Sequence, residues 1–204
     1  TQEIINLTGK YITNTYNRFP IAITKGKGCR VWDADGKEYL DFVAGLAVCN
    51  LGHCHPKVVK AIQEQAERLI HISNLYYIEP QARLAELLCK NSFAQKAFFC
   101  NSGAEANEAA IKLIRKYFKD KNEDKFQIIT MEQSFHGRTM ATLAATGQRK
   151  FQQGFEPLLE KFIYVPFDNV GAVADAITSQ TAAVMVEPIQ GEGGVNIPSD
   201  NYLK

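Results

Sequence analysis

The spacing of apolar residues changes along the chain, and each spacing predicts a different element. At residues 29–42, two short runs of strand-forming residues flank Asp35 and Gly36, which is the strongest local signal for a β-hairpin. After Pro56, which suits the first turn of a helix, apolar residues recur at helical spacing. A second amphipathic helix is expected at about residues 79–90, with three leucines on one face.

The second half of the chain alternates between short apolar runs and helical patterns. Strands are expected at four places: residues 97–100, 126–131, 162–165 and 182–186. Helical segments are expected from Gly103 onward, from near Arg138, and across residues 170–177. The inward face of the first of these should carry Ala106, Ala109, Ala110, Leu113 and Tyr117. Apolar strands interleaved with helices predict an α/β fold, with a largely parallel sheet covered on both faces.

Composition narrows the class of protein. The 204 residues are 46% apolar and 22% charged, and 23 basic against 22 acidic side chains leave a net charge of +1. This balance excludes a disordered chain and gives no electrostatic reason to expect nucleic acid or an anionic membrane as partner. No run approaches the roughly 20 apolar residues of a membrane span, and the N-terminus lacks the features of a signal peptide. We therefore expect a soluble, cytoplasmic protein that acts on small molecules.

The cysteines and the end of the chain add two expectations. The cysteine count is odd and the residues are scattered among apolar neighbours, which predicts reduced core thiols rather than disulfides. They are Cys29, Cys49, Cys54, Cys89 and Cys100. Residues 198–200 resemble a helix start capped by Ser199 or Asp200, yet the sequence stops at Lys204 within the first turn. A helix that short does not hold together, so we expect the chain to be the front part of a longer protein.

Ligands of open α/β sheets bind beyond the carboxyl ends of the strands, so the segments after the strands are where a site is expected. After Cys100, a glycine turn opens directly onto a helix. Free amides at that helix start, the helix dipole and the Ser102 hydroxyl would hold a phosphate. An ordinary turn capped by Ser102 explains the same residues equally well. Neither the dinucleotide-binding nor the P-loop glycine pattern is present.

The loop after the next strand combines aromatic and cationic side chains. Residues 134–139 present the rings of Phe135 and His136 together with the Arg138 guanidinium. Such a set would stack on a flat heteroaromatic ring and grip a carboxylate with two hydrogen bonds. A satisfied loop histidine beside a surface arginine is the competing interpretation, and on these residues alone it is favoured.

Two other polar groups give weaker signals. Glu187 and Glu192 lie in a glycine-rich loop at residues 187–194, where they would pair with a cation or order a cofactor, or simply form a flexible, solvated connection. His53, Cys54 and His55 are common zinc ligands, but adjacent residues point to opposite sides and no second cluster supplies the missing ligands. No metal is expected.

Five segments taken together resemble one known family, the class III or ornithine-type aminotransferases that use pyridoxal 5'-phosphate. Each segment alone would be a weak signal, but in this order along almost the whole chain they are highly specific. The segments are GKGCRVWDADGKEYLDF at 26–42, LGHCHPKV at 51–58, SGAEANEAAIKLIRK at 102–116, SFHGRT at 134–139 and VEPIQGEGG at 186–194. Within the family, HISNLYY at 71–77, followed by PQARLAELL, is most similar to members that act on N2-acetylornithine.

The resemblance implies a role for each site residue that binds the cofactor. Gly103 and Ala104 would donate backbone amides to the cofactor phosphate, with Ser102 in support. Phe135 would lie against the pyridine ring, and His136 would lie beside Phe135 in the same loop. Glu187 is expected as a further carboxylate near the cofactor.

The substrate would be held by other residues that match the family's pattern. Arg138 matches the arginine that binds the α-carboxylate, and Tyr16 aligns, through a shorter match, with a substrate-contacting tyrosine. Glu192 matches a glutamate that pairs with an arginine from the C-terminal half. That pair would release the arginine when 2-oxoglutarate binds. The implied reaction moves the δ-amino group of N2-acetylornithine to 2-oxoglutarate, forming glutamate, in a homodimeric enzyme of arginine biosynthesis.

The resemblance also implies what lies outside the chain. The family's Schiff-base lysine and the aspartate facing the pyridine nitrogen would lie beyond Lys204, so no catalytic residue is assigned and the fragment alone is expected to be inactive. The implied fold is the three-layer α/β/α fold type I of pyridoxal-phosphate enzymes, incomplete here. Residues 51–204 would form the first part of the large domain, and residues 1–50 a segment of a small α+β domain. The competing functions are another class III transaminase, acting on ornithine, succinylornithine, succinyldiaminopimelate or 4-aminobutyrate, or a non-catalytic phosphate-binding module.

Overall fold

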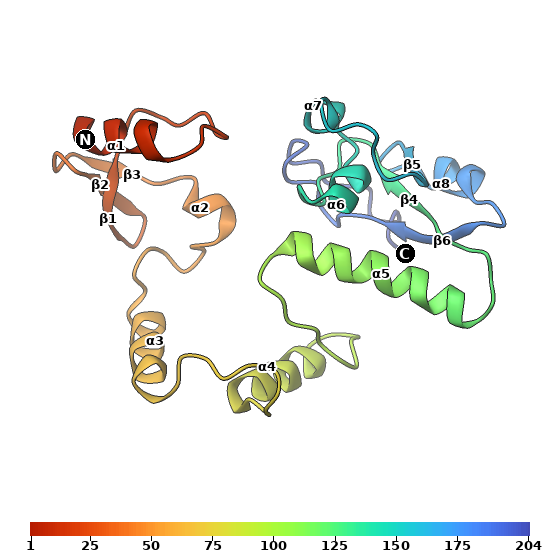
Figure 1. Cartoon of the computed structure of the whole chain (residues 1–204), viewed down its shortest axis with the longest axis horizontal. Coiled ribbons are helices and arrows are strands. Elements are labelled where there is room, and N and C mark those ends of the chain that lie inside the picture. Colours follow the sequence, from red (N-terminus) through yellow and green to blue (C-terminus); the bar gives the residue numbers. More distant parts are fainter. The chain divides into compact units, whose positions relative to one another are not determined.

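The computed structural model describes all of residues 1–204, and the chain divides into two compact units (Figure 1). The first unit covers Thr1–Ala82 and the second covers Arg83–Lys204. The domain boundary expected between residues 50 and 51 stays a prediction. None of the helices combines the length and the apolar character needed to cross a bilayer.

The first unit contains a small antiparallel sheet of three strands. They are β1 (Ile23–Lys27), β2 (Arg30–Asp33) and β3 (Glu38–Leu40), in the order β1-β2-β3. The hairpin predicted at residues 29–42 is confirmed as the β2–β3 pair. Strand β1, which was not predicted, pairs with β2 across a two-residue turn at Gly28, whose φ of +58° is one that glycine adopts without strain.

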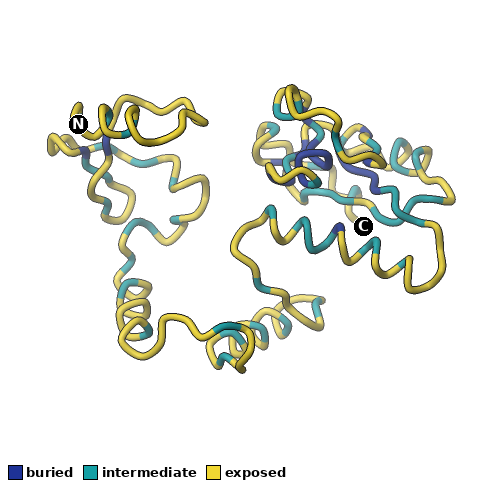
Figure 2. Tube along the Cα trace, in the orientation of Figure 1, coloured by how far each residue is buried: buried dark blue, intermediate teal, exposed yellow.

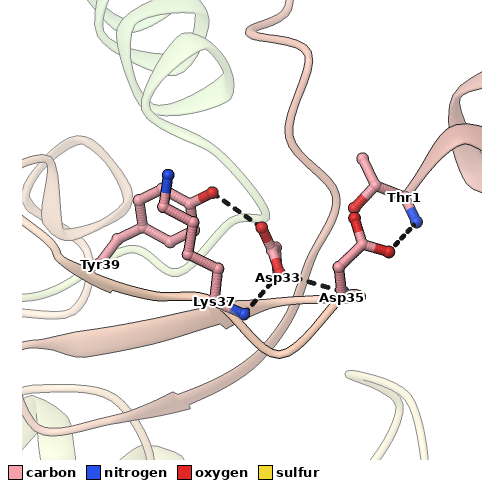
Figure 3. A network of polar contacts seen from close by, with 5 residues as sticks. All are labelled: Thr1, Asp33, Asp35, Lys37 and Tyr39. Carbon is pink, nitrogen blue, oxygen red and sulfur yellow. Dashed lines mark hydrogen bonds and ion pairs between the residues drawn. The ribbon is translucent and has the colours of Figure 1, made fainter.

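The hairpin turn is fixed by the carboxylate of Asp33 (Figure 3). Its Oδ1 accepts the backbone amides of Asp35 at 3.0 Å and Lys37 at 2.9 Å, while its Oδ2 accepts the Tyr39 hydroxyl at 2.7 Å. The Tyr39 hydrogen bond is the main reason that the pKa of Asp33 lies below its ordinary value. Asp35, at the tip, accepts the Thr1 ammonium group at 2.9 Å. An ionised Asp33 therefore organises the turn from one side chain.

Four helical elements complete the first unit and its link to the second. They are α1 (Gln2–Tyr11), α2 (Ala44–Ala47), α3 (Pro56–Arg68) and α4 (Glu79–Lys90). Helices α3 and α4 agree with the predicted ones. Element α2 is a left-handed turn, because Ala44, Gly45, Leu46 and Ala47 all have positive φ. Left-handed backbone costs a residue with a side chain roughly 1–2 kcal/mol, so this turn is held by its surroundings.

The second unit is built around a parallel sheet. Its strands are β4 (Gln127–Met131), β5 (Phe162–Val165) and β6 (Thr181–Met185), in the order β5-β4-β6. Its remaining helices are α5 (Gly103–Asp120), α6 (Met140–Ala145), α7 (Arg149–Gln152) and α8 (Val170–Ala176). The strands predicted at 126–131, 162–165 and 182–186 and the helices between them are confirmed, with shifts of one or two residues.

Alternate residues of β4 face two separate apolar cores, which makes the unit three-layered. Ile128 packs with Ile111 of α5 and Ala144 of α6 on one face. On the other face Ile129 belongs to a cluster against which Val173 of α8 packs. The buried residues gather around β4 and the loop that follows it (Figure 2). The predicted α/β fold, with a parallel sheet covered on both faces, is thus confirmed.

Three expectations about local structure were wrong. Residues 97–100 are not a strand, since no described strand pairs with them and Phe98 is 71% exposed. The inward face of α5 carries Ile111 and Ile114. Of the residues expected there, Ala109 and Ala110 are half-buried, whereas Ala106, Leu113 and Tyr117 are exposed. None of the cysteines is a core thiol: Cys29, Cys54 and Cys100 are exposed, and Cys49 and Cys89 are half-buried. Residues 200–203 form a turn, in keeping with the expectation that a helix cut off within its first turn does not hold together.

Candidate functional site

The start of helix α5 is shaped by a reciprocal pair of side chains. Ser102 caps the helix, its Oγ accepting the Glu105 amide at 3.1 Å. The Glu105 carboxylate reaches back and accepts the Asn101 amide at 2.8 Å. Hydrogen bonds from Asn101, first of all from its side chain, lower the pKa of Glu105. These contacts fix the turn that precedes the helix.

The next two backbone amides at this helix start remain available. Gly103 and Ala104 donate to no acceptor within the chain, and a Cβ added at Gly103 would meet nothing within 4 Å. Unpaired amides beside open space at a helix N-terminus form a site for an anionic group such as a phosphate. The residues present therefore fit the phosphate of pyridoxal 5'-phosphate.

The loop after β4 packs directly against the first turns of α5. A Cβ added at Gly137, whose φ is +132°, would lie 2.8 Å from the Ala104 Cβ, so only glycine fits between the two segments. The Asn107 side chain donates to the His136 carbonyl at 2.7 Å, and Thr139 Oγ1 donates to the Glu108 carboxylate at 2.5 Å. The start of α5, with its free amides, and the loop carrying Phe135 therefore form one site.

A buried polar network holds the base of this loop. The Thr130 hydroxyl donates to the Ala145 carbonyl at 2.9 Å and lies 3.1 Å from His136 Nε2 and 3.3 Å from Ser134 Oγ. A hydroxyl has one proton, so Thr130 accepts from His136, whose neutral ring must carry its proton on Nε2. Burial lowers the pKa of His136 from 6.5 to about 4, which keeps the ring neutral at pH 7.

The side chains of Phe135 and Arg138 both contact a third residue, Phe151 of α7. The rings of Phe135 and Phe151 meet edge to face, with centroids 5.7 Å apart. The Arg138 guanidinium lies over the Phe151 ring, 4.6 Å from its centroid. Arg138 makes no hydrogen bond or ion pair within the chain, so its five N–H donors are available to a carboxylate.

The loop after β6 packs on the loop after β4. The Phe135 amide donates to the Glu187 carboxylate at 3.1 Å, and the Gln190 side chain donates to the Glu132 carbonyl at 2.8 Å. A Cβ at Gly193 would collide with the Gln133 carbonyl oxygen, so this approach requires glycine. Burial raises the pKa of Glu187 above its ordinary value, and hydrogen bonds from the Phe135 and Gly191 amides partly oppose that rise.

The structure brings together most of the residues singled out in the sequence. Ser102, Gly103, Ala104, Phe135, His136, Arg138 and Glu187 all belong to the segments joined by these contacts. Glu192 lies in the third segment with an exposed side chain. Tyr16 belongs to the first unit, where it is 61% exposed and lies under the Arg18 guanidinium. The ligand contacts expected of all these residues stay predictions.

Sequence reasoning missed three residues that shape the site. Thr130 lies inside a strand, Asn107 lies on a helix, and Phe151 follows no recognisable motif. A buried strand residue with a hydroxyl, as at Thr130, was the one available signal, because buried polar groups need partners. The other two depend on contacts between segments that no local pattern encodes.

Comparisons with known proteins agree with this geometry. The family described as Aminotransferase class-III matches residues 11–204. The chain therefore belongs to the class III aminotransferase family, whose members use pyridoxal phosphate.

Among individual proteins, the chain is similar to acetylornithine aminotransferases. It is 55% identical over 201 residues to that of Methanocaldococcus jannaschii, which covers 98% of this chain and 50% of the relative. For that of Caldanaerobacter subterraneus subsp. tengcongensis, the identity is 54% over 98% of this chain and 51% of the relative. The chain thus spans about half the length of the curated relatives it matches.

Solved structures of aminotransferases are also similar to this chain, again over about half of their own length. The ornithine aminotransferase of Toxoplasma gondii, crystallised with pyridoxal phosphate partly occupying its active site, matches with a TM-score of 0.92 and 34% identity, over 99% of this chain and 48% of that one. The N-acetylornithine aminotransferase of Stenotrophomonas maltophilia matches with a TM-score of 0.78 and 40% identity, over 98% of this chain and 48% of that one.

Proposed function

We propose that this chain supplies the phosphate-binding and ring-binding part of an enzyme that transfers the δ-amino group of N2-acetylornithine to 2-oxoglutarate in arginine biosynthesis. One observation carries the proposal. The start of α5, the loop at residues 134–139 and the loop at residues 187–194 lie together, beside the carboxyl ends of the parallel strands. The 53–55% identity of the whole chain to several acetylornithine aminotransferases favours this substrate over the other class III substrates.

Each residue of this part has a defined task in the proposal. The amides of Gly103 and Ala104 bind the cofactor phosphate, with the Ser102 cap fixing the turn. Phe135 presents its ring to the cofactor, and the amide of Phe135 is held by Glu187. Pyridoxal 5'-phosphate, when bound, supplies the electron sink for transfer of the amino group.

Arg138 orients the substrate by its α-carboxylate. Its planar guanidinium would form two parallel hydrogen bonds, which fix both position and orientation and so direct the distal amine toward the cofactor. Glu192 and Tyr16 are proposed as further substrate-binding residues, and we expect the whole enzyme to be a homodimer. The Schiff-base lysine is expected in the part of the enzyme that follows residue 204.

Arg138→Ala in the full-length enzyme tests the proposal. We expect kcat/KM for N2-acetylornithine to fall, by a factor that corresponds to a loss of about 2–4 kcal/mol in transition-state stabilisation. The affinity for the cofactor should be nearly unchanged. Arg149→Ala, which removes an equal charge from an exposed residue of α7, is the matched control and should change kcat/KM less than threefold. Equal losses of cofactor affinity and activity in Arg138→Ala would mean that the arginine only supports the loop.

Two measurements separate the competing functions. Steady-state rates with N2-acetylornithine, N2-succinylornithine, ornithine and 4-aminobutyrate identify the substrate, and faster turnover of free ornithine would overturn the substrate proposed. The full-length protein should be yellow when loaded with cofactor, and borohydride should bleach the colour. A colourless protein that takes up no pyridoxal phosphate would favour a non-catalytic phosphate-binding module.

A further inference from the structure

The Arg138 guanidinium lies over one aromatic ring and has no hydrogen-bonding or ionic partner in the chain. The ring is that of Phe151, and the guanidinium carbon lies 4.6 Å from its centroid. An exposed arginine without a polar partner would sample many rotamers, and ordering it on substrate binding costs free energy. A flat ring restricts the guanidinium to stacked orientations while leaving the N–H donors at its edge unused.

Helix α7, which carries Phe151, is anchored at both of its ends. The side chain of Gln148, just before α7, donates to the Ser134 carbonyl at 3.0 Å. The side chain of Gln152 donates to the Thr146 carbonyl at 2.8 Å and contacts the Tyr164 hydroxyl at 2.9 Å. Helix α7 is thereby tied to the base of the loop that carries Phe135 and Arg138.

The same ring also contacts Phe135. The two rings meet at an interplanar angle of 75° with centroids 5.7 Å apart, a favourable edge-to-face arrangement. Phe151 therefore lies between the residue proposed to face the cofactor ring and the residue proposed to bind the substrate carboxylate. A single anchored side chain fixes the position of one relative to the other.

We propose that Phe151 is a positioning residue for substrate recognition: its ring holds the Arg138 guanidinium in the orientation that binds the α-carboxylate, at a set distance from Phe135. This inference rests on the proposed role of Arg138. It predicts that loss of the Phe151 ring lowers kcat/KM only for substrates that carry the α-carboxylate.

The test uses the full-length enzyme with two substrates that differ only in the carboxylate. These are N2-acetylornithine and N-acetyl-1,4-diaminobutane, which lacks the α-carboxylate. Phe151→Leu, which removes the ring but keeps an apolar side chain, should lower kcat/KM for N2-acetylornithine about three- to tenfold, mainly through KM. The same variant should change kcat/KM for the diamine less than twofold. Phe151→Tyr, which restores a ring, should recover most of the loss.

Phe126→Leu is the matched control, because Phe126 is also half-buried and faces a cation, Lys161, at 5.9 Å. It should leave both substrates unaffected. In an Arg138→Ala background, Phe151→Leu should cause no further loss with N2-acetylornithine. An equal loss with both substrates, or a further loss in that background, would overturn the positioning role.

The outcomes also separate this inference from the proposed function. If Arg138→Ala reduces kcat/KM for N2-acetylornithine but Phe151→Leu does not, only the positioning role fails. If Arg138→Ala leaves that value unchanged, the proposed carboxylate site fails and the role of Phe151 fails with it.

Discussion

Protonation of His136 should destabilise the second unit as the pH falls from 6.5 to about 4. The ring is 5% exposed, and burial lowers its pKa to about 4, against 6.5 for an exposed histidine. Between these two values the unfolded chain binds a proton that the folded chain does not. Stability contributed by the neutral ring is therefore complete above pH 6.5 and is lost as the pH falls toward 4.

The size of this effect follows from the same two pKa values. One unbalanced proton corresponds to a slope of about 1.4 kcal/mol per pH unit, and the full interval amounts to roughly 3 kcal/mol. Glu187 acts in the opposite direction, because its raised pKa contributes stability at low pH that is lost as the pH rises. The pH profile of a single protein therefore mixes both groups, whereas a comparison of two variants separates them.

The comparison is between the wild-type chain and His136→Gln, whose side-chain amide also donates to Thr130 but does not titrate. Urea unfolding at a series of pH values between 4.5 and 6 gives the free energy of unfolding of each. Any loss of packing in the variant shifts its profile by a constant, so only the slopes matter. The slopes should differ by about 1.4 kcal/mol per pH unit, and parallel profiles would refute the assignment of a buried neutral histidine.

Two further substitutions test the contacts that shape the site. Thr130→Val should lower the free energy of unfolding by about 2–4 kcal/mol, because His136 and the Ala145 carbonyl lose their hydrogen-bonding partner. Thr130→Ser, which keeps the hydroxyl, should lower it by only about 1 kcal/mol. Equal losses for the two variants in urea unfolding would exclude the hydroxyl as the cause. Gly137→Ala should cost about 1–3 kcal/mol, because the added Cβ would collide with Thr142 and Ala104 and because its φ of +132° strains a residue with a side chain. It should also weaken cofactor binding by the full-length enzyme in a fluorescence titration. Unchanged stability and affinity in Gly137→Ala would show that the loop moves aside freely.

Local patterns predicted the elements of the second unit because its strands and helices are encoded within short stretches. β4 was visible as a short run of mostly apolar, strand-forming residues, since both of its faces are buried. The hairpin was visible because Asp35 and Gly36 satisfy the turn directly. The motif at residues 102–107 marked the start of α5 to within a residue, since a capping serine defines that boundary.

The wrong predictions concern features that depend on packing or pairing partners distant in the sequence. Helix α5 has two apolar stripes, and spacing alone does not decide whether the one with Ile111 or the one with Leu113 faces the sheet. Residues 97–100 have the composition of a strand, but a strand needs a neighbour to pair with. The exposed cysteines show the same difficulty, because apolar neighbours in sequence do not ensure burial.

The contacts of the site were the least predictable part. Its motifs indicated which residues gather, but not that Phe151 would join Phe135 to Arg138, or that Thr130 would hold His136. These contacts join residues between 6 and 16 positions apart across a strand, a loop and a short helix. Only the folded chain decides which side chains meet there.

Strand β4 bears on how this protein tolerates change. Ile128 and Ile129 pack in the two opposite cores, and Thr130 contacts His136 in the loop that carries the site. Each of these three consecutive side chains is therefore constrained by its own partners. A library of random variants should therefore be depleted of substitutions along this strand more strongly than along β5 or β6.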